Sequence, residues 1–164
     1  MLSQTENLES PFEEKVRVRA CGLLIEKGKV LLLKHDTIGP EGYLWSPPGG
    51  GVAFGEQAVD ALKKEFLEET NLKVEVGRYL FANEFIDHRH HAIELFFEVR
   101  RVSGNLKLGI DPELSTEKQI LTDARFFSFD KLKTLPKNAL HNIFSLAEPM
   151  DKIIELRGLY TFKY

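Results

Sequence analysis

The sequence is poor in the features that several classes of protein depend on. It has one cysteine, Cys21, in 164 residues, which excludes an internal disulfide and a disulfide-stapled scaffold. No run reaches the roughly 18 apolar residues of a membrane span, and the net charge of −3 leaves no basic excess for nucleic acid or an anionic membrane. We therefore expect neither a membrane nor a DNA partner. Cys21 lies in an apolar run and is predicted to be a small buried hydrophobe.

The first 14 residues also lack a targeting pattern. They are polar and acidic, without a basic segment followed by an apolar one, so we expect a flexible N-terminal segment and a cytoplasmic location. The remaining residues, 15–164, contain no repeat and no linker composition. With 43% hydrophobic residues overall, the chain can build a sizeable core, and we expect one domain.

Hydrophobic patterning predicts several strands around one helix. Alternating or continuous apolar runs predict a first hairpin from residues 16–25 and 30–33, and a second, long hairpin from residues 72–85 and 92–102. A further strand is predicted at residues 120–129. Towards the C-terminus we expect a short helix or turn at 130–135, an amphipathic helix at 137–156 and a last strand or partner-binding tail at 160–164.

The most informative stretch is residues 49–72, where three consecutive glycines and Gly55 lead into an acidic helix predicted to begin at Glu56. Glu65, Glu68 and Glu69 fall within an arc of about 100°, because positions three and four apart share one face of a helix. Three neighbouring carboxylates repel one another, and a divalent cation would turn that repulsion into binding. Such carboxylates, with water and substrate phosphates, are the usual ligands of Mg²⁺. The alternative is a solvated acidic helix face.

This stretch resembles the Nudix box, G-x5-E-x7-R-E-U-x-E-E-x-G-U, where U is a bulky apolar residue. The residues that match the motif are Gly50, Glu56, Glu65, Phe66, Glu68, Glu69 and Leu72. Lys64 stands where the motif has Arg, and Asn71 stands where it has Gly. Asn readily takes the left-handed turn that ends a helix, whereas Lys64 would hold a carboxylate less rigidly than a planar guanidinium.

The resemblance implies an α/β fold, a Nudix-like α/β/α sandwich with a mixed sheet and a catalytic loop and helix. It implies hydrolysis of a nucleoside diphosphate linked to another group, with Mg²⁺ held by Glu65, Glu68 and Glu69 and by the carbonyl of Gly49. Mn²⁺ as a substitute for Mg²⁺ and a homodimer are further predictions. Glu56 and Lys64 are expected to orient the metal ligands. The proton of the attacking water would go to Glu65 or to a loop glutamate.

The loop at residues 103–116 is the longest, and long loops in compact domains often carry function. Nudix-like enzymes often bring an extra carboxylate from such a loop, which makes Glu113 and Glu117 candidates; a plain surface role stays open for both. Glu94, among apolar residues, is expected on a polar or site-facing surface of the sheet.

Two aromatic features have alternative interpretations. Trp45, next to a proline corner, is expected to pack against the sheet, with stacking on a base as the alternative. His88, His90 and His91 invite a transition-metal interpretation, but no cysteine accompanies them, and we expect a solvated loop at the rim of the site.

The substrate is predicted only by class. The window around Asp87 has neither the proline that would suggest ADP-ribose nor the tyrosine that would suggest dinucleoside polyphosphates. We favour ADP-ribose or a nucleotide sugar, because the long hairpin and loop after the helix could enclose a second moiety. A nucleoside triphosphate or the 5′ end of RNA remains an alternative. A different class is a Nudix-like module that binds a nucleotide without hydrolysing it, and a third is a structural domain with a chance match.

Overall fold

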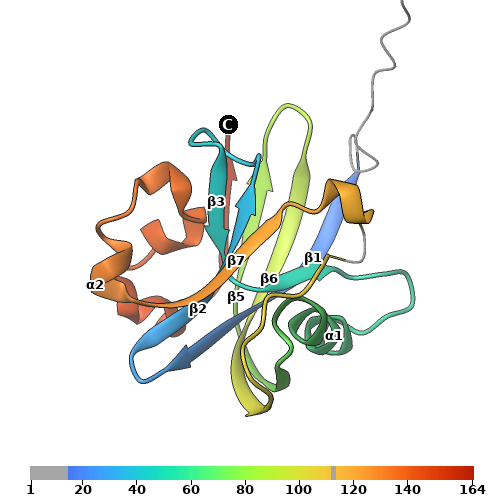
Figure 1. Ribbon diagram of the computed structural model, residues 1–164. Coiled ribbons are helices and arrows are strands. Elements are labelled where there is room, and N and C mark those ends of the chain that lie inside the picture. Colours follow the sequence, from blue (N-terminus) through green and yellow to red (C-terminus); the bar gives the residue numbers. More distant parts are fainter. Residues whose placement is uncertain (1–14, 112–113) are drawn as a thin grey trace, which may run out of the picture.

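The computed structural model describes residues 15–111 and 114–164, so the predicted flexible segment 1–14 lies outside the described residues. These residues form a curled mixed sheet with α1 packed on one side and short helical segments on the other (Figure 1). The strands are β1 Val16–Glu26, β2 Lys29–Asp36, β3 Tyr43–Ser46, β4 Gly49–Gly51, β5 Lys73–Ile86, β6 His91–Ser103, β7 Leu121–Ser128 and β8 Leu159–Lys163.

The strand order β3-β2-β1-β6-β5-β8 confirms the predicted mixed sheet. β1 runs parallel to β6, with Arg19 opposite Glu94, and antiparallel to β4, with Arg19 opposite Gly51. The hairpin of β1 and β2 is shorter than predicted. Only two residue pairs join them at the turn, because β1 continues along β6 while β2 pairs along its length with β7. β1 therefore borders both halves of the curled sheet.

The predicted long hairpin and last strand are confirmed. β5 and β6 pair antiparallel from Lys73 opposite Ser103 to Ile86 opposite His91, and β8 adds a parallel edge strand beside β5. The strand and short helix predicted after the long loop correspond to β7 and to α2 Phe129–Leu132.

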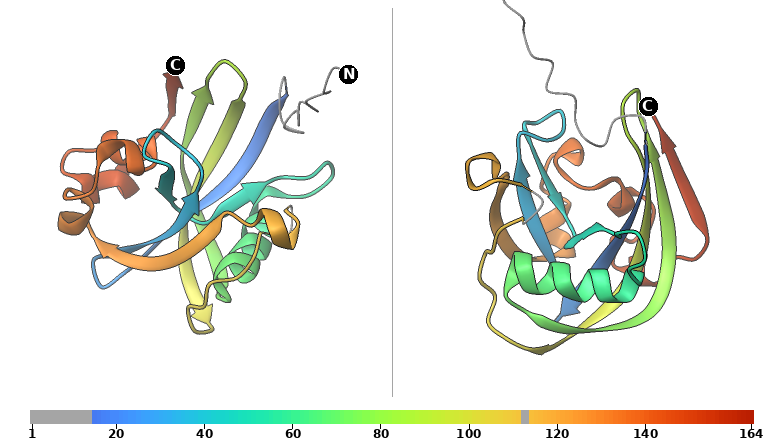
Figure 2. Two further views of the ribbon diagram at one scale, coloured as in Figure 1. Left: turned by 45° about the horizontal axis from the view of Figure 1, so that its top comes forward. Right: turned by 90° about the vertical axis from the view of Figure 1, so that its right-hand side faces the viewer.

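Helix α1, Ala58–Thr70, covers one side of the sheet (Figure 2). Leu62 and Phe66 are fully buried there, in a core with Ala20, Leu24 and Leu31. The helix begins two residues later than predicted, because the Glu56 side chain accepts a hydrogen bond from the backbone N–H of Ala53 and stays in the turn before the helix.

The opposite side is covered by α2 and by three 3-10 helices: η2 Lys137–Ala139, η3 Asn142–Ser145 and η4 Met150–Glu155. The prediction of one amphipathic helix at 137–156 is therefore wrong. Pro149 has no N–H for a helix interior, and the N–H of His141 donates instead to the carbonyl of Trp45, at 2.9 Å. The segment still buries Ile143, Phe144 and Ile153 in a second core.

Together the two cores make the sandwich that the sequence predicted, with the second helical layer built from short turns. Within the described residues, no helix is both long enough and apolar enough to cross a membrane.

Candidate active site

The glycine strand β4 lies between β1 and α1, where larger residues do not fit. A Cβ on Gly49 would lie 2.4 Å from the carbonyl oxygen of Ala20, and one on Gly50 would lie 2.3 Å from the carboxyl carbon of Glu65. Both distances are shorter than real Cβ contacts. The glycines therefore let the backbone approach the helix carboxylates directly.

Glu65 and Glu69 are buried on α1, 5% and 4% exposed. Glu69 accepts a hydrogen bond from the N–H of Gly49 at 3.2 Å. Burial and the neighbouring Glu65 carboxylate raise the pKa of Glu69 to about 8, against the opposing effect of the Gly49 N–H. The sequence predicted an acidic face, and the structure turns two of its members inwards against β4.

Glu68 is half-buried, and its Oε2 atom is buried without a hydrogen-bond partner. A buried carboxylate oxygen without a partner is costly and requires an explanation, such as an ion. Within residues 15–111 and 114–164, no three His, Cys, Asp or Glu side chains are gathered closely enough to hold a metal by themselves. Mg²⁺ usually takes only one or two protein carboxylates and completes its shell with water and phosphate oxygens. One or two carboxylates of the Glu65, Glu68 and Glu69 set, with water and phosphate oxygens completing the shell, would fit such an ion.

Glu56, in the turn before α1, faces Lys64 on the helix. Lys64 Nζ lies 4.0 Å from Glu56 Oε1, and the Lys64 side chain is 54% exposed. An exposed pair at this distance contributes little to stability. Lys64 therefore lies near the Glu56 carboxylate and holds it only loosely, as a Lys in place of Arg would.

The C-terminal end of α1 is closed by Asn71 and by the loop after β6. Asn71 takes the left-handed conformation with φ 59°, as predicted, and its N–H donates to the carbonyl of Leu67. The N–H of Gly109 donates to the carbonyl of Glu69 at 2.8 Å. The long loop thus packs against the end of the helix that carries the carboxylates.

Of the two candidate loop carboxylates, only Glu117 lies within the described residues. Glu117 is exposed on η1, Thr116–Lys118, and Glu113 lies outside the described residues. Asp111, which was not among the predicted site residues, acts on the pKa of Glu69 and raises it. Its loop is fixed by Gln119, whose side chain bonds both the N–H and the carbonyl of Asp111 at 2.7 Å. Asp111 is therefore an acid of the long loop whose charge reaches the carboxylates of α1.

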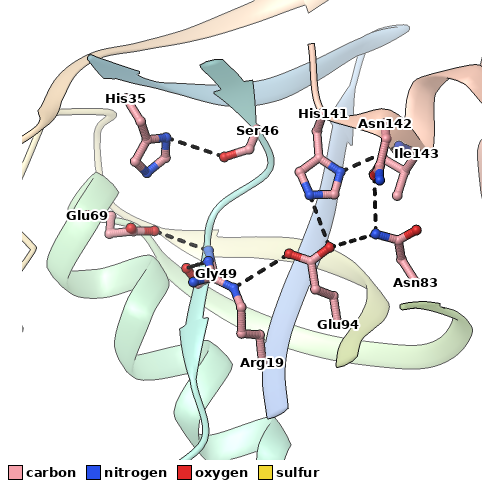
Figure 3. A network of polar contacts seen from close by, with 10 residues as sticks. All are labelled: Arg19, His35, Ser46, Gly49, Glu69, Asn83, Glu94, His141, Asn142 and Ile143. Atoms are coloured by element: carbon pink, nitrogen blue, oxygen red, sulfur yellow. Dashed lines mark hydrogen bonds and ion pairs between the residues drawn. The ribbon is translucent and has the colours of Figure 1, made fainter. Parts of the chain in front are cut away.

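A polar network that the sequence did not reveal extends from the glycine strand into the sheet (Figure 3). Arg19 donates from Nη2 to the carbonyl of Gly49 at 3.2 Å, and its Nε lies 3.6 Å from Glu94 Oε1. Glu94 Oε2 accepts from Asn83 at 2.8 Å and lies 3.0 Å from His141 Nε2. The network joins β1, β5, β6 and the start of η3. Of these residues, only Glu94 was expected on a polar or site-facing surface of the sheet, and it is buried within the network.

Burial alone would raise the pKa of Glu94, but His141, Arg19 and Asn83 together lower it to about 2. The carboxylate is therefore ionised at neutral pH. His35, whose Nδ1 lies 3.4 Å from Ser46 Oγ, has its pKa lowered to about 4 by burial and by the charge of Arg19. The histidine is neutral at the same pH.

The predicted burial of Trp45 and Cys21 is confirmed. Trp45 is buried and meets Phe127 edge to face, with ring centroids 4.8 Å apart, and Cys21 is buried. In the loop between β5 and β6, Asp87 accepts hydrogen bonds from the N–H groups of Arg89 and His90, both at 2.7 Å, which makes a local turn.

Comparison with known proteins agrees with this geometry. A family model described as NUDIX domain matches residues 14–146. The chain belongs to the Nudix family. It is 30% identical over 120 residues to an ADP-ribose pyrophosphatase of Methanocaldococcus jannaschii, a match that spans 72% of this chain and 65% of the relative. The chain thus matches slightly less than two thirds of that relative's length.

Solved structures show the same Nudix fold. A NUDIX hydrolase from Nitrosomonas europaea aligns with a TM-score of 0.65 at 20% identity, over 90% of this chain and 79% of that one. An ADP-ribose pyrophosphatase from Streptococcus suis aligns with a TM-score of 0.60 at 20% identity, over 87% and 98% of the two chains. At these identities the likeness establishes the fold alone.

Proposed function

We propose that this Nudix domain hydrolyses the pyrophosphate bond of a nucleoside diphosphate linked to another group, with Mg²⁺ as the metal. The observation that carries the proposal is the set of acids on α1. Glu65 and Glu69 are buried beside β4, and Glu68 Oε2 is buried without a partner. Family membership supports the same reaction class. Such a cluster is unfavourable by itself and becomes favourable when a cation occupies it.

Glu65, Glu68 and Glu69, with the carbonyl of Gly49, would hold the ion. When bound, Mg²⁺ would neutralise the diphosphate charge and lower the pKa of a coordinated water. The N–H of Gly49 keeps the Glu69 carboxylate directed at β4.

The remaining charged residues would orient substrate and water. Glu56 fixes the turn before α1 through its hydrogen bond from Ala53, and Lys64 partly neutralises it. A carboxylate would accept the proton of the attacking water, and the candidates are Glu65 and the loop residues Asp111 and Glu117.

We propose ADP-ribose or a nucleotide sugar as the substrate class. The names of two similar proteins, both ADP-ribose pyrophosphatases, support this choice, as does a structural neighbour described as a UDP-X diphosphatase. The products would be a nucleoside monophosphate and a phosphorylated second product. Mn²⁺ as a substitute metal, the homodimer and the cytoplasmic location stay predictions.

The test is product release from a substrate panel of ADP-ribose, nucleotide sugars, dinucleoside polyphosphates, nucleoside triphosphates and 5′-triphosphorylated RNA, each with Mg²⁺ and with chelator. We expect Mg²⁺-dependent release of a nucleoside monophosphate from ADP-ribose or a nucleotide sugar. Release from triphosphates or RNA alone would overturn the substrate class. If no substrate of the panel is hydrolysed but a ligand raises the unfolding temperature, the result would support the non-hydrolysing module. The replacement of the motif's Arg by Lys64, which pairs only loosely with Glu56, would then explain the lost activity.

A further inference from the structure

Arg19 places a positive charge next to the carbonyl oxygen of Gly49, the proposed metal ligand. Its Nη2 donates to the Gly49 carbonyl at 3.2 Å, and β1 and β4 are paired at this point. A carbonyl oxygen has two lone pairs, so it can accept this hydrogen bond and still face a cation. The hydrogen bond fixes the carbonyl, but a guanidinium at this distance also repels a divalent cation on the other side of the oxygen.

Glu94 supplies the opposite charge. Its Oε1 lies 3.6 Å from Arg19 Nε, and the side chains of Glu94 and Arg19 are 9% and 28% exposed, so water screens the pair only in part. Its other oxygen is held by Asn83 and His141, which come from a different strand and from the segment before η3. Because these partners keep the carboxylate ionised, its charge is present across the neutral pH range.

The arrangement is poorly explained by stability alone. Asn83 is fully buried, yet its Oδ1 has no hydrogen-bond partner, and Arg19 Nε is buried without a hydrogen bond. Buried ion pairs are often no more stabilising than apolar residues of the same size. A better reason for the Arg19–Glu94 pair is the proposed metal site, which Arg19 contacts through the Gly49 carbonyl.

We propose that Glu94 is a positioning residue for the metal, because its charge lets Arg19 fix the Gly49 carbonyl without repelling the cation. This inference rests on the proposed function, since it requires a divalent cation at Gly49 and the α1 carboxylates. Glu94 itself touches neither metal nor substrate. It acts only through Arg19.

The test measures Mn²⁺ affinity of the metal-free protein by electron paramagnetic resonance, without substrate. Glu94→Gln keeps the size of the side chain and removes its charge, so we expect Mn²⁺ to bind about 10- to 100-fold more weakly. Arg19→Gln loses the hydrogen bond to Gly49 but also the repelling charge, so the expected loss is smaller. In the double variant Arg19→Gln/Glu94→Gln, affinity should be tighter than in Glu94→Gln alone.

The effects of the two substitutions on Mn²⁺ affinity are thus expected not to add, which a simple loss of structure would not produce. Steady-state kinetics give a second readout: saturating Mg²⁺ should restore the kcat of Glu94→Gln, whereas a distorted fold would not be restored. If Glu94→Gln does not fold, the double variant is compared with Arg19→Gln. Removing Glu94 after Arg19 should then cost little, and a further tenfold loss of affinity would overturn the proposal.

Glu98→Gln is the matched control. It also removes an ion-paired glutamate of β6, but the partner of Glu98 is Arg78, 2.7 Å away, instead of Arg19, so Mn²⁺ affinity should be unchanged. If wild-type protein binds no Mn²⁺, the proposed function fails. If wild type binds it and Glu94→Gln binds equally well, only the role of Glu94 fails.

Discussion

Gly50 shows how the absence of a side chain shapes the site. The residue pairs with Ala20 on β1 while the carboxyl group of Glu65 fills the space where its Cβ would be. The run of three glycines was visible in the sequence, but its partner on α1 was not. The physical reason is close packing: a strand and a helix carboxylate share a gap that has no room for one methyl group.

Gly50→Ala should therefore displace Glu65 and remove most hydrolytic activity, with a loss of about 1–3 kcal/mol in the free energy of unfolding. The measurements are kcat on the substrate found in the panel and chemical denaturation. Gly28→Ala is the control: its φ of 73° strains an alanine, but nothing lies within 4 Å of the added Cβ. Equal activity per folded molecule in the two variants would contradict the proposed packing role of Gly50.

His35 offers a prediction of pH dependence. Its pKa is about 4 in the folded protein, below the ordinary 6.5 of the unfolded chain. Its contribution to stability is therefore complete above pH 6.5 and is lost as the pH falls towards 4, because the unfolded chain takes up the proton first.

Replacing His35 by Gln should remove this part of the acid sensitivity, roughly 2–3 kcal/mol between pH 6.5 and pH 4. Denaturant unfolding of both proteins across that range provides the measurement. Parallel stability curves for the two proteins would show that His35 titrates alike in the folded and unfolded states.

At the scale of elements, the helix, the long hairpin and the edge strand could be predicted because their patterns are local. The amphipathic spacing of α1, the left-handed residue Asn71 and the alternation in β5 and β6 each involve near neighbours. The Arg19–Glu94 pair joins residues 75 positions apart through a parallel register, which a single sequence does not reveal. The segment 137–156 failed as a helix because its backbone groups bond to β3 and to local turns.

The contact between the long loop and the end of α1 gives a prediction at this scale. A Cβ on Gly109 would overlap the carbonyl oxygen of Glu68, at 1.7 Å, and would break the hydrogen bond to Glu69. Gly109→Ala should push the loop away and cost about 1–3 kcal/mol in the free energy of unfolding. The control is Leu108→Ala, a partly exposed neighbour that should cost less. The measurement is the thermal unfolding temperature of both variants and of wild type. A Gly109→Ala protein as stable as wild type would disprove the contact between the loop and α1.

At the scale of the whole molecule, two cores hold a curled sheet between α1 and the C-terminal turns, and the site lies where α1 meets the glycine strand. The fold and the position of the acidic helix followed from the resemblance to the Nudix box. The inward turn of Glu65 and Glu69, the part played by Asp111 and the network behind Gly49 needed the three-dimensional arrangement, since each depends on contacts between distant segments.

The most direct test of the central claim, that the α1 carboxylates bind the catalytic metal, is Mg²⁺-dependent hydrolysis by wild type and by Glu68→Gln on the same substrate. We predict that Glu68→Gln loses activity by at least about two orders of magnitude yet unfolds at the same or a higher temperature without metal, since it removes one repelling charge. Asp60→Asn, an exposed acid of the same helix, should stay fully active. Full activity of Glu68→Gln would contradict the assignment of the metal site.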